Sequence, residues 1–288
     1  MKKQNVAVLV GAAVMALTSS LGGAAMASGP TPQPVSAEVQ PVSHTVDKSQ
    51  TSGSAASPLA DRYSIAAPTK NGGASTDSVI GADGRVRITN TTAAPNRSIV
   101  QIEFNGGYIC SGSLISDDTV LTAGRCVHTG GTGSTADYSW GVKVALGRNG
   151  STDPYGTCGA TQLLTDQRWI DSANTNADWG VIKLDCTIGN TTGWLNYTGT
   201  TASLNGTTAT VRGYPGDKAF GTMWSMTGTI DSSATEKVYY KMDTFGGQSG
   251  APVYNSSNTL VAIHTNGGST NSGTRITPTL ANYLTSVK

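Results

Sequence analysis

The sequence predicts an all-β fold, because short apolar runs recur along the chain and turn residues separate them. The runs alternate or carry β-branched residues, Gly, Asn and Ser clusters bound them, and almost no segment has a helical period. They span residues 97–104, 142–146, 179–184, 207–214, 237–242 and 260–264. Their number and spacing favour a barrel or a sandwich, and residues 78–288 suffice for one large all-β domain or two small ones.

One helix is expected, at the C-terminal end of the sequence. Thr277 has the side chain of an N-cap, and Pro278 suits the first helical position. Leu280, Leu284 and Val287 then fall on one face of the helix. The sequence therefore predicts a short helix that packs this apolar face against the β domain.

The first 77 residues have a different composition from the rest. Lys2 and Lys3 precede the apolar run Val6–Leu17, and Ala25-Met26-Ala27 is a small-x-small cleavage signal, so residues 1–27 are interpreted as a signal peptide. This run is too short to span a bilayer, which favours secretion without a membrane anchor. Residues 28–77 are rich in Ser, Thr, Pro, Ala and Gln. They fit a flexible linker or a propeptide, and their place after a signal peptide favours the propeptide.

Charge and cysteine content exclude several classes of function. The formal net charge is only +1, which gives no reason to expect nucleic acid as a partner. There are four cysteines, and no CxxC pair or zinc-type Cys/His spacing occurs among them. We therefore expect two disulfides, no metal and no cofactor; three pairings are possible for Cys110, Cys126, Cys158 and Cys186.

The segment DTFGGQSGAPV, Asp243–Val253, carries the strongest chemical signal. Two glycines before Ser249 permit unusual backbone dihedrals, and a serine on such a turn can present its hydroxyl outward. The N–H groups of Gly247 and Ser249 could then converge as an oxyanion site. Ala251 stands where the strand-to-helix nucleophile elbow needs glycine, which argues against an α/β-hydrolase.

Together with this loop, four further motifs resemble the chymotrypsin-type serine proteases, and most closely their bacterial glutamyl endopeptidase branch. The motifs are LTAG-x-CV, NADWGVIKL, VAIHTNGG and GYPGDK, with SVIGADGR as the start of the mature chain at Ser78 or Val79. The resemblance covers residues 78–288. It implies two packed six-stranded antiparallel β-barrels with the active site between them. It also implies a secreted zymogen that cleaves polypeptides after Glu and, more weakly, after Asp; we expect a monomer whose other partner is its own propeptide.

The resemblance also assigns residues. Ser249 matches the nucleophile and Asp178 the buried aspartate that orients the base. His264 matches the histidine at the floor of the substrate pocket, and Thr244 matches a hydroxyl there. Thr265–Gly267 match the strand that pairs with the substrate backbone. The family places a disulfide at Cys110–Cys126, which leaves Cys158–Cys186 as the second pair.

The sequence departs from the family at Arg125, which occupies the position of the catalytic histidine. A guanidinium cannot accept the serine proton near neutral pH, because its pKa stays above ~12. We expect Arg125 to pair with Asp178 and to fill the space that an imidazole needs. His128, three residues later, could replace the base only if the loop rearranged.

Three functions therefore remain open. The first is a glutamate-preferring endopeptidase in which codon 125, one base from a histidine codon, is a substitution or a reading error. The second is a pseudoprotease that binds acidic peptides without cleaving them. The third is a structural secreted β-protein whose GGQSG loop is incidental.

Overall fold

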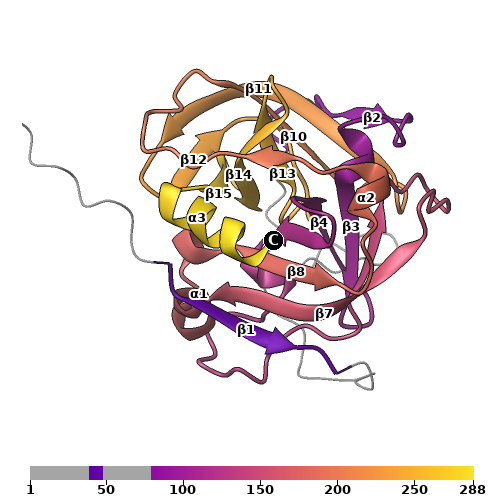
Figure 1. The fold of residues 1–288 in the computed structure, drawn as a ribbon. Coiled ribbons are helices and arrows are strands. Elements are labelled where there is room, and N and C mark those ends of the chain that lie inside the picture. The colour runs from indigo at the N-terminus through magenta and orange to yellow at the C-terminus, as the bar shows by residue number, and fades with distance from the viewer. Residues whose placement is uncertain (1–38, 48–78) are drawn as a thin grey trace, which may run out of the picture. The chain divides into compact units, whose positions relative to one another are not determined.

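The computed structural model describes residues 39–47 and 79–288. The expected signal peptide, most of the expected propeptide and Ser78 lie outside these ranges. The described residues form two antiparallel β-barrels and a short C-terminal helix (Figure 1), which confirms the predicted all-β, chymotrypsin-like fold. No helix in residues 39–47 or 79–288 has the length and apolar character needed to cross a membrane.

The first barrel closes through antiparallel pairing between its last two strands, β7 and β8. Its strands are β3 (Ile99–Phe104), β4 (Tyr108–Leu114), β5 (Thr119–Thr122), β6 (Lys143–Leu146), β7 (Thr157–Asp166) and β8 (Gly180–Leu184). Along β3, Val100 and Ile102 point into the barrel core, while Ile99 packs in the cluster between the barrels. Both faces of this strand are therefore buried, which explains its nearly continuous apolar sequence.

The second barrel closes in the same way, through pairing of β10 with β11. Its strands are β10 (Thr208–Gly213), β11 (Met223–Ser233), β12 (Lys237–Tyr240), β13 (Pro252–Asn255), β14 (Thr259–Asn266) and β15 (Asn271–Arg275). Two short strands extend it: β2 (Val86–Ile88) pairs with β11, and β9 (Asn196–Tyr197) pairs with β14.

Helices are few and short in the described part of the chain. They are α1 (Gln167–Ser172), α2 (Gly189–Thr192), α3 (Pro278–Val287) and 3-10 turns at Asn96–Ser98, Gly124–Cys126 and Thr175–Ala177. The predicted C-terminal helix is confirmed as α3, and the Thr277 side chain accepts a hydrogen bond from the Leu280 N–H as its N-cap. Leu280 and Leu284 are buried in the cluster between the barrels, so the helix holds the two barrels together.

One strand lies where none was expected. Residues 41–45, inside the Ser/Thr/Pro-rich segment, form β1 (Pro41–Thr45), which pairs with the outer edge of β7 (Figure 1). The pattern was missed because Val42, His44 and Val46 alternate over too short a run to stand out from a polar segment. β1 is an addition to the six strands that close the first barrel.

The topology places two chain segments at one edge of the first barrel. β5 and β8 are antiparallel neighbours, with Thr122 opposite Gly180. Residues just after β5 and just before β8 therefore emerge side by side. Arg125 belongs to the first segment and Asp178 to the second.

Candidate active site

The loop that carries Ser249 can only be built with glycine on both sides of the serine. Gly247 has φ +95° and Gly250 has φ +82°, in the left-handed region that other residues avoid. A Cβ on Gly247 would lie 2.6 Å from the Tyr214 carbonyl oxygen, and one on Gly250 would lie 2.1 Å from the Thr122 Oγ1. The two glycines therefore fix the turn between β12 and β13 that presents Ser249.

The first barrel holds this loop from the other side. The Ser111 N–H donates to the Ser249 carbonyl oxygen at 2.8 Å, and the Ser111 hydroxyl donates to the Gly247 carbonyl oxygen at 2.9 Å. The Cys126 Sγ lies 3.6 Å from the same Ser249 carbonyl oxygen. Because Cys126 follows Arg125 directly, position 125 lies beside the serine loop.

A disulfide fixes the segment around position 125. Cys110 on β4 is bonded to Cys126 in the 3-10 turn, and Cys158 is bonded to Cys186, the pairing that the resemblance implies. The turn Gly124–Cys126 is buried throughout. The side chain at position 125 is thereby held at one place between the barrels.

Arg125 and Asp178 form a buried ion pair. The guanidinium donates through Nε at 3.0 Å and through Nη2 at 2.5 Å to the Asp178 Oδ2. The Arg125 backbone N–H donates to the Asp178 Oδ1 at 3.1 Å. Asp178 is fully buried and Arg125 is only 8% exposed. Both carboxylate oxygens are thus occupied by the residue at the expected base position.

The guanidinium also packs against an aromatic ring. Its central carbon lies 5.8 Å from the centre of the Trp169 ring, within the range of a cation–π contact. Trp169 is itself buried and donates its Nε1–H to the His128 carbonyl oxygen at 3.0 Å. Arg125 is therefore held on two sides, by the Asp178 carboxylate and by the Trp169 ring.

His128 is turned away from the serine loop. Its Nδ1 accepts from the Gly130 N–H at 2.9 Å, and its Nε2 lies 2.8 Å from the Ser134 carbonyl oxygen. This arrangement fixes a neutral imidazole with hydrogen on Nε2. Burial lowers its pKa below the usual value of 6.5. Both ring nitrogens serve the 128–134 loop, so the structure does not bring His128 together with Ser249 as a substitute base.

His264 lies on β14 close behind the serine loop. Its backbone carbonyl oxygen accepts from the Gly250 N–H at 2.7 Å, and its Nδ1 lies 2.8 Å from the Tyr240 hydroxyl. Burial, and then the positive charges of Arg125 and Lys237, lower its pKa to about 3. The imidazole is therefore neutral, and it can act on a ligand through hydrogen bonding rather than through charge.

Thr244 supplies a buried hydroxyl without a protein partner. Its side chain is fully buried, and its Oγ1 has no hydrogen-bond partner among the residues that the structure describes. A buried hydroxyl left in this state costs free energy unless a ligand or water satisfies it. Thr244 follows Asp243 in the turn that leads to Ser249, so this open donor lies in the same loop as the serine.

Three further residues at this site were not identified from the sequence. Lys237 is buried and donates from Nζ to the Thr265 Oγ1 and the Asn266 Oδ1, both at 3.0 Å. Burial lowers its pKa to about 8, against an opposing effect of the Asp178 charge. A lysine that starts a strand is ordinarily exposed, so nothing in the pattern marked it. Tyr240 lies in the same strand, whose pattern predicted a β-strand and no functional role.

Asp243 is the third residue, and it anchors the segment at Ile80 and Gly84. Its carboxylate accepts from the N–H groups of Ile80 and Gly84, both at 2.7 Å. This contact ties the segment after the expected mature N-terminus to the residue that precedes Thr244. Asp243 belongs to the DTFGGQSG block, but a single aspartate in a loop predicts no particular hydrogen-bond partner.

The expected substrate-pairing residues run past the end of β13, on one side of β14, while on the other side Asn266 still pairs with Ser272 of β15. The pairing of β14 with β13 ends at Ile263, and Thr265 follows within β14 while Gly267 lies just beyond it. The Thr265 hydroxyl is engaged by Lys237, which holds this part of the strand in place.

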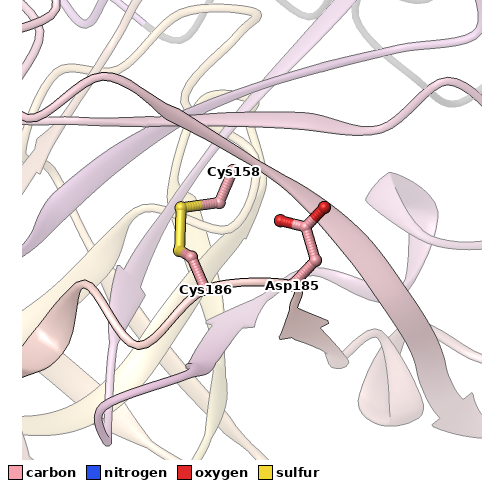
Figure 2. Close-up of side chains that lie close together, drawn as sticks. All are labelled: Cys158, Asp185 and Cys186. Carbon is pink, nitrogen blue, oxygen red and sulfur yellow. A yellow bond between two sulfur atoms is a disulfide. The ribbon is translucent and has the colours of Figure 1, made fainter.

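One group of potential metal ligands occurs among the described residues, and it lies away from this site. It comprises Cys158, Asp185 and Cys186 (Figure 2). The two sulfur atoms are bonded to each other, so neither is a thiolate that could ligate an ion. The Asp185 carboxylate instead accepts from the Gly159 N–H at 2.8 Å. These residues do not fit a metal site while the disulfide is intact.

Comparison with known proteins agrees with this geometry. The Trypsin family model matches residues 86–288. The chain is 46% identical over 223 residues to a glutamyl endopeptidase of Bacillus licheniformis, covering 73% of this chain and 69% of that protein. It is 44% identical over 220 residues to a Bacillus subtilis protein named extracellular metalloprotease, covering 72% and 68%. A solved structure of a Glu endopeptidase in complex with MPD superposes with a TM-score of 0.68 at 34% identity, covering 73% and 99%.

The matched region contains both barrels, the serine loop, Arg125 and Asp178. The sequence identities far exceed those expected from a shared fold alone. This chain therefore belongs to the trypsin family of serine proteases.

Proposed function

We propose that this chain is a secreted member of the glutamyl endopeptidase branch that binds peptides at a Glu side chain, and in which Arg125 blocks cleavage. The observation that carries this proposal is the buried Arg125–Asp178 ion pair beside the Ser249 loop. The aspartate that would orient a base holds a group that cannot accept a proton. The peptide-binding parts of the site are otherwise retained.

The pocket residues support an acidic side chain as the bound group. The Thr244 hydroxyl is an open donor. When the Tyr240 hydroxyl donates to the His264 Nδ1, the His264 Nε2 carries a hydrogen and becomes a second donor. Two neutral donors in a buried site suit a carboxylate, and hydrogen bonds to charged groups are stronger than those between neutral ones. Relatives named glutamyl endopeptidase support the same substrate class.

The positive charges nearby would favour the carboxylate further. Burial is the main cause of the lowered pKa of His264, and the charges of Arg125 and Lys237 add to it, so both lie within electrostatic reach of this imidazole. Lys237 also sets the strand that is expected to pair with the substrate backbone. We assign it a positioning role for Thr265 and a supporting role in attracting acidic peptides.

With histidine at position 125 the same geometry would perform peptide hydrolysis. Asp178 would hold the imidazole through one nitrogen, and the other nitrogen would take the Ser249 proton as the hydroxyl attacks the scissile carbonyl. The Gly247 and Ser249 N–H groups would stabilise the oxyanion. The imidazolium would then donate its proton to the leaving amine. With arginine, the first proton transfer has no acceptor.

Export and processing belong to this proposal as well. Residues 1–27 would direct secretion, residues 28–77 would be a propeptide, and residues 78–288 would be the monomeric protease domain. The apolar run and cleavage signal near the N-terminus support export, and so does the name of the extracellular Bacillus subtilis relative. The anchoring of Ile80 and Gly84 by Asp243 supports a defined start for the protease domain.

Peptide binding tests the proposed function without requiring turnover. We expect the unmodified chain to bind a fluorescent hexapeptide amide with one Glu more tightly than the same peptide with Gln. Thr244→Val should lower the affinity for the Glu peptide by about 10- to 100-fold, because the substitution removes a hydrogen bond to a charged group. Fluorescence anisotropy measures both affinities.

Thr227→Val is the matched control. Its hydroxyl bonds to Thr210 on the exposed side of β10 and β11, away from the pocket, so peptide affinity should not change. Equal affinity for the Glu and Gln peptides, or equal effects of the two valine variants, would refute the assignment of the pocket.

A further inference from the structure

We propose that the outer edge of β7 is a peptide-binding edge whose occupant is residues 39–47 of this chain, retained after cleavage between residues 48 and 78 and released in acid. The cleavage rests on the proposed function, in which residues 28–77 are a propeptide, and another protease would make it because Arg125 blocks the chain's own activity. The retained strand is a separate property, because its site lies on the first barrel and does not include Ser249.

The backbone of the segment is paired from Gln40 to Val46. β1 runs antiparallel to β7, from Pro41 opposite Asp166 to Thr45 opposite Gln162. Beyond the strand, the Gln167 N–H donates to the Gln40 carbonyl oxygen at 2.7 Å, and the Val46 N–H donates to the Thr161 carbonyl oxygen at 2.9 Å. Such strand addition is a recurring mode of peptide recognition, with affinity from the backbone and specificity from alternate side chains.

The alternate side chains provide that specificity. Val42, His44 and Val46 are half-buried, while Ser43 and Thr45 between them are exposed. Val42 and Val46 pack against the core of the first barrel. β1 thus presents one apolar face to the barrel and one polar face to solvent, as an added edge strand should.

Tyr138 forms the centre of the binding surface. The His44 ring stacks on the Tyr138 ring with centroids 4.8 Å apart, and the Tyr138 hydroxyl donates to the Val42 carbonyl oxygen at 3.3 Å. The His128 ring meets the same tyrosine ring edge-on, also with centroids 4.8 Å apart. One tyrosine ring therefore contacts both a histidine of the segment and a histidine of the barrel.

Protonation of these histidines opposes binding. Burial in the bound state lowers the pKa of His44 below 6.5. Burial also lowers the pKa of His128, against the Ser134 hydrogen bond and the Asp137 charge, which raise it, and His44 adds a smaller lowering effect. The other titratable groups around them are the Tyr138 phenol, whose pKa burial raises to about 12, and Asp137, which acts on His128. Asp166, at the far end of the strand, is paired with Arg168.

The direction of the pH effect follows from these pKa values. Because the pKa of His44 is lower in the bound state than in the free peptide, free peptide takes up the proton more readily. Binding is therefore strongest above about pH 6.5 and weakens as pH falls below it. A second charge on His128 would add repulsion, because His44 and His128 interact electrostatically.

The test uses the full chain with the recognition sequence of a site-specific protease placed within residues 48–78, so that cleavage does not depend on the chain's own activity. After cleavage, we expect the N-terminal fragment to co-elute with the protease domain at pH 7.5 on gel filtration and to separate from it at pH 5. Mass spectrometry of the eluted peak identifies the fragment. Separation of the fragment at pH 7.5 would overturn the proposal.

Substitutions one residue apart distinguish the bound face from the solvent face. Val42→Asp should reduce the fragment retained at pH 7.5 at least 10-fold, and Ser43→Asp should leave it unchanged. His44→Gln should keep the fragment bound at pH 5. Equal effects of the two aspartates would contradict the binding face, and acid release of the His44→Gln fragment would contradict the role of His44.

Folding does not confound this comparison if the changes are carried on peptides. Synthetic peptides of residues 37–48 with each substitution compete with the retained fragment of the otherwise unchanged cleaved chain. The unsubstituted and Ser43→Asp peptides should displace it, and the Val42→Asp peptide should not. Failure of the unsubstituted peptide to displace the fragment at any concentration would also contradict the proposal.

Discussion

Arg125→His is expected to raise the turnover number of this chain on a Glu-containing peptide by up to about 10⁶, roughly 8 kcal/mol of activation free energy. The substitution removes a group that cannot accept a proton and supplies one whose pKa suits neutral pH. Asp178 is already positioned, since its two carboxylate oxygens are held by the side chain and the backbone of residue 125. A chromogenic peptide with Glu before the scissile bond measures the effect.

Arg125→Lys and Arg125→Gln are the controls for this substitution. Neither side chain reproduces an imidazole, so neither should restore turnover, although Gln removes the positive charge as His does. The rate of the Arg125→His variant should fall in acid as its imidazole is protonated. Substantial and equal turnover by the unmodified chain and the His variant would refute the block by Arg125.

Asp178→Ala is expected to lower the free energy of unfolding of the unmodified chain by about 3–5 kcal/mol. It leaves the buried Arg125 guanidinium without its counter-charge, and uncompensated buried charges are strongly destabilising. Adding Arg125→Met should recover most of this loss, because a methionine of similar length can pack against Trp169. Urea unfolding of the four proteins gives the coupling free energy.

Lys143→Ala is the matched control for an ion pair on the surface. Lys143 lies 3.8 Å from Glu103 and its side chain is 47% exposed, so the loss should stay below about 1 kcal/mol. A similarly small effect of Asp178→Ala, or additive effects of the two changes at positions 125 and 178, would show that the buried pair is not coupled.

Where a pattern is local, the sequence predicted the strands and the residues of the site well. Alternating or β-branched runs located strands such as β3 and β8, and the Thr277-Pro278 pair located α3. Several of the strands that were missed are rich in Ser, Thr and Gly; β4, with buried Ser111 and Ser113, is an example. Small polar residues are typical of loops, but in β4 they are buried by close packing between strands.

Contacts between distant segments could not be predicted in the same way. The family resemblance indicated Ser249, Asp178 and the position of Arg125, but Lys237 and Tyr240 act at the site only because β12 and β14 both pair with β15. The neutral state of His264 also depends on burial and on Arg125, which no local pattern reports. The strand at residues 41–45 needed its partner β7 to be recognised.

Covalent labelling of Ser249 tests most directly whether this site is complete except for its base. A peptidyl phosphonate ester with Glu next to phosphorus reacts with a serine only when the hydroxyl is activated, and mass spectrometry of the digested protein locates the label. We predict labelling of Ser249 in the Arg125→His protein and none in the unmodified chain over the same time. Equal labelling of both proteins, or no labelling of the His variant, would contradict the account.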